Sequence, residues 1–139
     1  MGKVVEKVVA ELLLEEAETT GLLGDGQFGR TKARSAIDAV DIMVCRAHAA
    51  WMNGHITRML LMVIKASFPS LAKGSPVNLM KVRQMDGDLI QQTESFLSER
   101  TVEMIIEGNV MKRHPLEEGV QEGAPVSPIL FAICSSRLI

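Results

Sequence analysis

Apolar residues recur at helical spacing in the first part of the chain and predict two amphipathic helices. In the first helix apolar pairs alternate with polar residues every three to four positions, and the helix is expected to end near Gly21. Ser35 and Asp38 have capping-box spacing and predict the start of a second helix, which Asn53-Gly54 ends. The apolar positions expected to face inward are Val4/Val5, Val8/Val9 and Leu12/Leu13 in the first helix and Ala36, Ala39, Val40, Met43, Val44, Ala47 and Trp51 in the second.

Shorter elements are expected in the remainder of the chain. The compact apolar run from Ile56 to Ile64 suits a buried strand. Ser75-Pro76 predicts the start of a short helix to about Met85, and Asp86 is expected to cap another helix. Alternation over residues 101–106, a turn at 107–109 and a return at Val110-Met111 predict a hairpin.

The order of these elements defines the fold class. The apolar stretch of residues 125–139 completes the series helix, helix, strand, helix, helix, hairpin, helix. This series predicts an α/β or α+β domain, with helices packed on a small sheet that carries one β-hairpin. With 139 residues, of which 47% are hydrophobic and 23% charged, the chain is expected to form one globular domain.

Charge and cysteine usage narrow the function classes. A net charge of −2 argues against a strongly basic nucleic-acid binder. Cys45 and Cys134 lie far apart, match no zinc spacing and suit a reduced, intracellular protein of the cytoplasm or nucleus. The apolar run Met59–Ile64 is too short to cross a bilayer, so no membrane partner is expected.

Three glycines, Gly24, Gly26 and Gly29, match the spacing of a dinucleotide-binding loop. That loop requires a preceding strand, whereas a helix is expected here, so a flexible connection between helices is favoured over a nicotinamide-binding dehydrogenase. Asp38 and Asp41 share a helix surface opposite the apolar stripe, which favours a solvated face over a metal site.

Residues 60–68 and 119–131 resemble, in the order and spacing of their residues, two motifs of the reverse transcriptases of non-LTR (LINE-like) retrotransposons. Residues 60–68, Leu-Leu-Met-Val-Ile-Lys-Ala-Ser-Phe, resemble the palm strand written as hydrophobic residues followed by D-I-x-x-A-F. Residues 119–131, Gly-Val-Gln-Glu-Gly-Ala-Pro-Val-Ser-Pro-Ile-Leu-Phe, resemble the later motif G-V-P-Q-G-S-P-x-S-P-x-L-F. Upstream, Gln27-Phe28-Gly29 with Arg34-Ser35 resembles the fingers motif Q-x-G-F-R-P-G-R-S. The resemblance implies a partial fingers and palm domain, with residues 1–55 in the fingers and 56–139 in the palm.

The same resemblance implies a damaged site. Polymerases of this family use two Mg²⁺ ions held by aspartates, and the first aspartate position is occupied here by Val63, which has no oxygen ligand. The resemblance assigns nucleotide contacts to Phe68, Glu122 and Gly123, but Glu122 replaces the family's glutamine and adds a charge that would repel a triphosphate. The remaining aspartates belong to an A-D-D segment that the sequence, ending at Ile139, does not contain.

These observations lead to the expectation of a truncated, degenerate polymerase copy that binds no metal cofactor and is inactive. The alternative is a non-catalytic nucleic-acid- or protein-binding module, with weak RNA or DNA binding through Arg30, Lys32 and Arg34. An unpaired edge on the strand at Ile56–Ile64 would favour self-association.

Overall fold

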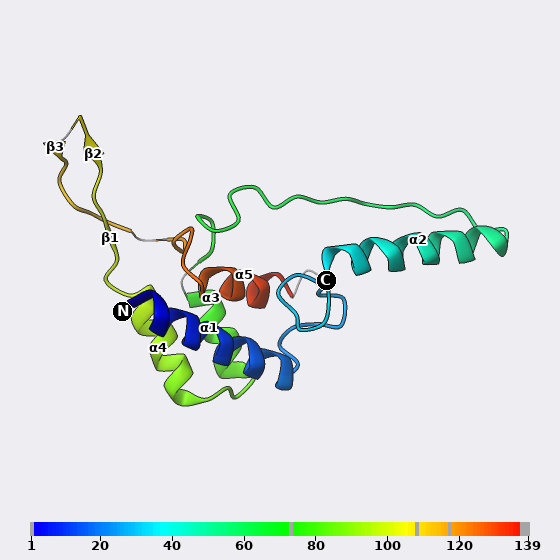
Figure 1. Cartoon of the computed structure of the whole chain (residues 1–139), viewed down its shortest axis with the longest axis horizontal. Helices are drawn as coiled ribbons and strands as arrows, with labels where there is room; N and C mark the ends of the chain where they lie inside the picture. The colour runs from blue at the N-terminus through cyan, green and yellow to red at the C-terminus, as the bar shows by residue number, and fades with distance from the viewer. Residues whose placement is uncertain (1, 73, 108, 117, 137–139) are drawn as a thin grey trace.

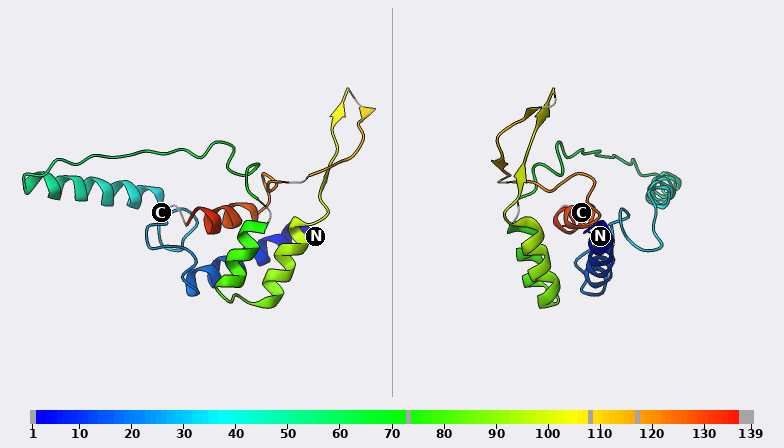
Figure 2. Two further views of the ribbon diagram at one scale, coloured as in Figure 1. Left: turned by 180° about the vertical axis from the view of Figure 1, so that it is seen from behind. Right: turned by 60° about the vertical axis from the view of Figure 1, so that its left-hand side comes forward.

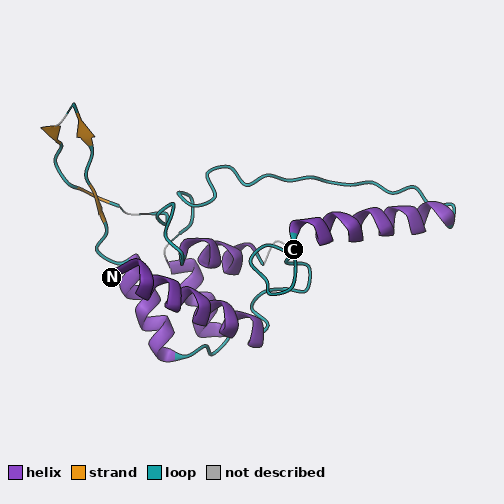
Figure 3. Ribbon diagram, viewed as in Figure 1, coloured by secondary structure: helices purple, strands orange, loops and turns teal. Residues whose placement is uncertain are grey.

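Five helices and four short strands make up the computed structural model, which describes residues 2–72, 74–107, 109–116 and 118–136. The helices are more numerous and longer than the strands, each of which has two residues (Figure 3). The elements in chain order are α1 (Gly2–Thr19), α2 (Ala36–Met52), α3 (Gly74–Val82), α4 (Gly87–Leu97), β1 (Thr101–Val102), β2 (Ile105–Ile106), β3 (Asn109–Val110), β4 (His114–Pro115) and α5 (Ser127–Ser135).

The core lies between α1, α3, α4 and α5. Helix α3 packs against α4 and α5, and α1 packs against the same two helices, so the four form one body (Figure 1). Leu13, Met80, Leu130 and Ile133 are fully buried at its centre. Burying a side chain of this size stabilises the fold by about 1.5–3 kcal/mol, so this body is the stable part of the molecule.

Local signals for the packed helices are confirmed. The Asp86 side chain caps α4 by accepting hydrogen bonds from the amides of Asp88 and Leu89 at 2.8 and 3.3 Å. Pro76 lies in the first turn of α3, but α3 begins at Gly74, one residue before Ser75, and ends at Val82 rather than near Met85. Helix α5 forms inside the predicted apolar stretch. None of the helices in the described part of the chain is both long and apolar enough to cross a membrane.

Helix α1 buries a different set of positions from the one predicted. Ala10, Leu13 and Ala17, spaced every three to four residues, face the core. Val4, Val5, Val8 and Leu12 are exposed, and only one residue of each of the two later pairs is covered. Each apolar pair spans a larger part of the helix surface than α4 and α5 cover. The periodicity therefore could not predict which residue of each pair would be buried.

Helix α2 begins as predicted but is not packed as predicted. Ser35 caps it, and the full capping box with Asp38 is present. No residue of α2 is buried, and α2 packs against none of the other described helices or strands. It projects from the four-helix body (Figure 2), so the expected inward apolar face is wrong.

The predicted strand at Ile56–Ile64 is wrong. These residues form a stretched segment that pairs with no strand in the described structure (Figure 1). Strand geometry is stabilised by ladder hydrogen bonds to a neighbouring chain segment, and the apolar run finds no such partner. The strand edge expected to promote self-association is therefore not formed.

The predicted hairpin is confirmed, although its Gly108 lies outside the described residues. Strand β1 pairs antiparallel with β4, and β2 pairs antiparallel with β3 near the tip. All the strand residues are exposed, so the expectation that helices pack on the sheet is wrong. The helices instead pack on one another because the short, twisted ribbon offers no broad apolar face. The architecture is mixed helix and small sheet, consistent with α+β.

The division into residues 1–55 and 56–139 stays a prediction. Helix α1, from the first part, packs on α4 and α5 of the second. The glycine loop of residues 24–29 joins α1 to α2, which confirms the expected connection between two helices.

Candidate functional site

The two segments singled out in the sequence meet at the edge of the helical body. The ring of Phe68, which follows the stretched segment, lies 5.7 Å from the ring of Phe131 in α5, with the planes tilted by 55°. Both rings are half-buried and pack against the core. We call the contact of residues 68–71 with residues 119–120 and Phe131 the motif junction.

Backbone hydrogen bonds hold the motif junction together. The amide of Val120 donates to the carbonyl of Phe68 at 2.9 Å, and the amide of Gly119 donates to the carbonyl of Leu71 at the same distance. Gly119 is buried with φ +84°, and a Cβ at this position would lie 2.8 Å from the carbonyl oxygen of Pro69. Only glycine therefore permits this close approach of the two backbones.

The turn after the motif junction carries Glu122 and Gly123. Both are exposed, and Gly123 adopts φ +84° with no other atom within 4 Å of its missing Cβ. Neither residue makes a contact that would preform a closed nucleotide pocket. The structure thus brings Phe68 against the segment that carries Glu122 and Gly123 but leaves the latter two open to solvent.

Arg100 joins this turn from the end of α4 and was not singled out by the sequence. Its guanidinium donates to the side-chain oxygen of Gln121 at 2.8 Å and lies 4.6 Å from the centre of the Phe96 ring. Burial lowers the pKa of Arg100, and the charge of Glu6 partly offsets that effect. No local pattern links Arg100 to Gln121, because the hairpin separates them in sequence.

Val63, which the resemblance aligns with a metal-binding aspartate, lies in the stretched segment. The Val63 side chain is 94% exposed, so it contacts almost nothing. Among the residues that the structure describes, no group of three or more His, Cys, Asp or Glu side chains is placed to hold a metal ion. Asp38 is occupied in the capping box, where hydrogen bonds from the Ser35 side chain and backbone lower its pKa.

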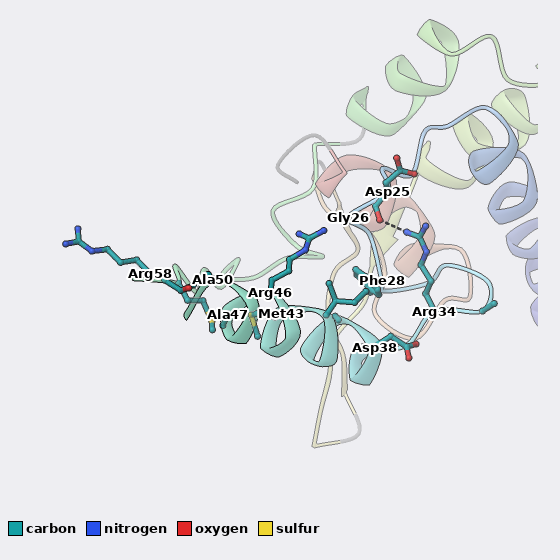
Figure 4. A pocket seen from close by; sticks show the side chains of 15 residues that line it. Asp25, Gly26, Phe28, Arg34, Asp38, Met43, Arg46, Ala47, Ala50 and Arg58 are labelled. Atoms are coloured by element: carbon teal, nitrogen blue, oxygen red, sulfur yellow. Dashed lines mark hydrogen bonds between the residues drawn. The ribbon is translucent and has the colours of Figure 1, made fainter. Parts of the chain in front are cut away.

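A separate open groove lies between α2, the glycine loop and the start of the stretched segment (Figure 4). Its volume is about 1030 Å³, and its walls are largely small or apolar. Three arginines line it: Arg34 from the loop, Arg46 from α2 and Arg58 from the stretched segment. Asp25 and Asp38 also line the groove, which reduces its positive charge.

The structure brings together two of the three basic residues predicted to act together, Lys32 and Arg34, but not Arg30. Arg34 is held in place: it donates to the carbonyls of Asp25 and Gln27 at 2.5 and 3.2 Å, and its guanidinium lies 5.5 Å from the Phe28 ring centre. Lys32 shares a small cavity with Arg34, whereas Arg30 lines another cavity beside α1 and Pro125.

Arg46 and Arg58 were not singled out by the sequence either, because only the path of the chain makes them line the same groove as Arg34. Arg58 lies at the end of the groove far from Arg34 (Figure 4). Within the described ranges neither Arg46 nor Arg58 forms an ion pair, so both are available to a ligand.

No protein-family model, curated protein or solved structure matches this chain.

Proposed function

We propose that this chain is a catalytically inactive derivative of a non-LTR (LINE-like) retrotransposon reverse transcriptase. The observation that carries the proposal is the motif junction. The two segments that resemble palm motifs are distant in sequence, yet Phe68 contacts Phe131 and accepts a hydrogen bond from Val120. Motifs that descend from one nucleotide site are expected to lie side by side, and this contact supports that origin.

The inactivity follows from the chemistry of the residues in the chain. Two-metal phosphoryl transfer needs carboxylate oxygens that hold both ions and align the primer hydroxyl with the triphosphate. The side chain of Val63 offers no ligand atom, and the described residues include no acidic cluster that replaces it. Glu122 adds negative charge beside the motif junction, where the resemblance places the incoming nucleotide.

Primer extension on an RNA template tests this proposal directly. The full chain, supplied with Mg²⁺ or Mn²⁺, is expected to extend the primer no more than the same protein after heat denaturation. Val63→Asp alone is expected to restore nothing, because one carboxylate does not complete a two-metal site. Metal-dependent extension by the unmodified chain would overturn the proposed inactivity.

Weak binding of single-stranded RNA or DNA in the groove is the second candidate. It is favoured by the arrangement of Arg34, Arg46 and Arg58 around a groove with apolar walls, since guanidinium groups pair with phosphates while apolar surface accommodates bases. Nothing in this candidate requires catalysis, so it is compatible with the loss of the metal site.

Fluorescence anisotropy with a labelled oligonucleotide at several salt concentrations measures this binding. Arg46→Gln with Arg58→Gln is expected to weaken binding and to reduce the salt slope by about 1–2 units. Arg83→Gln with Lys112→Gln, which removes two exposed charges that do not line the groove, is the matched control. Equal losses in the two proteins would show that net charge, rather than the groove, governs binding.

A further inference from the structure

Helix α2 carries a stripe of large apolar side chains that nothing in the described structure covers. Ile37, Val40, Val44 and Trp51 are 72%, 51%, 58% and 74% exposed. Their spacing of three, four and seven residues places them on one side of the helix. Ile37, Val44 and Trp51 repeat every seven residues, as the a positions of a helix-pairing seam do, with Val40 and Ala47 at the d positions. We call these five residues the α2 stripe.

The α2 stripe and the side of α2 that lines the arginine groove share only Ala47. The groove side is formed by Ala39, Ile42, Met43, Arg46 and Ala50, and several of these are half-buried. Ala47 lies at the boundary, because it belongs to the α2 stripe and also lines the groove. Advancing 100° per residue places the centre of that side more than a quarter turn from Val40 and Val44. A partner on the α2 stripe therefore leaves the groove open.

The molecule exposes more surface than a compact chain of its size. Its accessible surface is 10247 Å², whereas a compact monomer of 15.2 kDa exposes about 7,100 Å². The excess of about 3,100 Å² is shared by α2, the stretched segment and the hairpin, which project from the body (Figures 1 and 2). A standard interface removes about 800 Å² from each partner, which is about a quarter of this excess.

The charges of α2 favour a second copy in antiparallel orientation. Asp38 and Asp41 lie in the first half of the helix, and Arg46 and His48 lie in the second half. An antiparallel pair places each acidic half beside a basic half and aligns opposite helix ends, whereas a parallel pair places like charges at the same level. Asp41 and His48 flank the same edge of the α2 stripe, at e positions, and e positions face each other in an antiparallel pair.

We propose that the protein forms a twofold dimer in which the α2 stripes of two copies pack antiparallel around Val44. Val44 of one copy meets Val44 of the other, and Ile37 of one copy lies beside Trp51 of the other. Asp41 of each copy accepts a hydrogen bond from the imidazole of His48 of the other. A twofold axis makes the contact self-complementary, so it closes at two copies. The proposal is independent of the proposed function, because no residue of the motif junction takes part.

Sedimentation velocity of the full chain over a range of concentrations measures the dimer. Val44→Glu is expected to raise the dissociation constant roughly tenfold or more, because it places two like charges at the twofold axis. Ala49→Glu, at an exposed position on the opposite side of α2, is the matched control and is expected to leave the dimer intact. Circular dichroism checks that both variants keep their helices. A monomer at all concentrations, or equal effects of the two variants, would overturn the proposal.

Cysteine cross-linking determines the orientation of the helices. In a chain with Cys45 and Cys134 replaced by serine, Val44→Cys is expected to form a disulfide between copies under mild oxidation. Ile37→Cys is not expected to do so, because antiparallel packing separates the two positions by about 21 Å at 1.5 Å per residue. Efficient cross-linking through Ile37→Cys would contradict the antiparallel dimer.

Discussion

The rings of Phe68 and Phe131 lie 5.7 Å apart and tilted by 55°, and this contact joins the stretched segment to the last helix of the body. The adjacent hydrogen bond from the Val120 amide to the Phe68 carbonyl fixes the backbone on the same side. The position of residues 66–71 therefore depends on α5, which is itself anchored by the buried Leu130 and Ile133. The two segments of the motif junction are thus held together by a ring contact and by backbone hydrogen bonds.

The coupling between the two rings is measurable by a double-mutant cycle. Phe68→Leu and Phe131→Leu are each expected to destabilise the fold, with an interaction energy of about 0.5–1.5 kcal/mol beyond additivity. Chemical denaturation of the two single variants and the double variant measures it. Phe68→Leu combined with Phe96→Leu is the control, since Phe96 lies under Arg100 instead, and that pair is expected to be additive. Additivity in both pairs would contradict the ring contact.

Gly119 and Gly123 offer a matched comparison, because both have φ +84° but only Gly119 is crowded. Gly123→Ala is expected to lower the free energy of unfolding by about 1–2 kcal/mol, the strain of holding alanine in the left-handed conformation. Gly119→Ala also drives a Cβ to 2.8 Å from the Pro69 carbonyl oxygen and is expected to cost about 2–5 kcal/mol in total. Urea unfolding of both variants measures the difference, and equal losses would show that the backbones at the motif junction do not approach as described.

The two cysteines are expected to react at different rates. Cys45 is exposed on α2, whereas burial in α5 raises the pKa of the Cys134 thiol, an effect that a hydrogen bond with Ser75 partly offsets. Because the thiolate is the nucleophile, iodoacetamide at pH 8 is expected to label Cys45 clearly faster than Cys134. Mass spectrometry of peptides at successive times gives both rates, and unfolding in urea is expected to equalise them.

The same thiol predicts a loss of stability at alkaline pH. The Cys134 pKa is higher in the folded chain than in the unfolded chain, so the unfolded thiol ionises first. The contribution of the protonated thiol is fully present below the unfolded pKa of about 8.5 and is lost as pH rises through the folded value. Urea unfolding of Cys134→Ala is expected to show a weaker decline between pH 8 and 10 than the unmodified protein, and parallel declines would contradict this.

The capping box at the start of α2 predicts a linked change in helix content and titration. Ser35→Ala removes the side-chain hydrogen bond, which has the larger of the two lowering effects on the pKa of Asp38. This pKa is therefore expected to rise toward its ordinary value. The carboxylate stabilises the helix above the unfolded pKa of about 3.9, and this effect is lost as pH falls through the lower folded value. Carboxyl-carbon NMR titration follows Asp38, and circular dichroism follows α2. Ser95→Ala, at an exposed serine in α4, is expected to change neither.

Local interactions explain the elements that could be predicted from the sequence. Apolar spacing predicted α1, Ser35 and Asp86 predicted the starts of α2 and α4, and Pro76 predicted α3. These signals act within one or two turns of backbone, so they need no information about distant residues. The resemblance to reverse transcriptases depends only on residue types, and so does the expectation that Val63 replaces a metal ligand. Both stay predictions from the sequence.

Long-range contacts determine the features of the structure that the sequence did not predict. The apolar run at Ile56–Ile64 has the composition of a buried strand, but pairing requires a neighbour that only the tertiary arrangement can supply. The choice of Leu13 rather than Leu12 for the core, and the exposure of the α2 stripe, depend on which helices cover each face. The groups of side chains that face one ligand or one partner depend on the path of the whole chain. Arg34, Arg46 and Arg58 line one groove, and Arg100 lies beside Gln121, although the sequences of these segments carry no signal of one another. Only the folded structure reveals these groups.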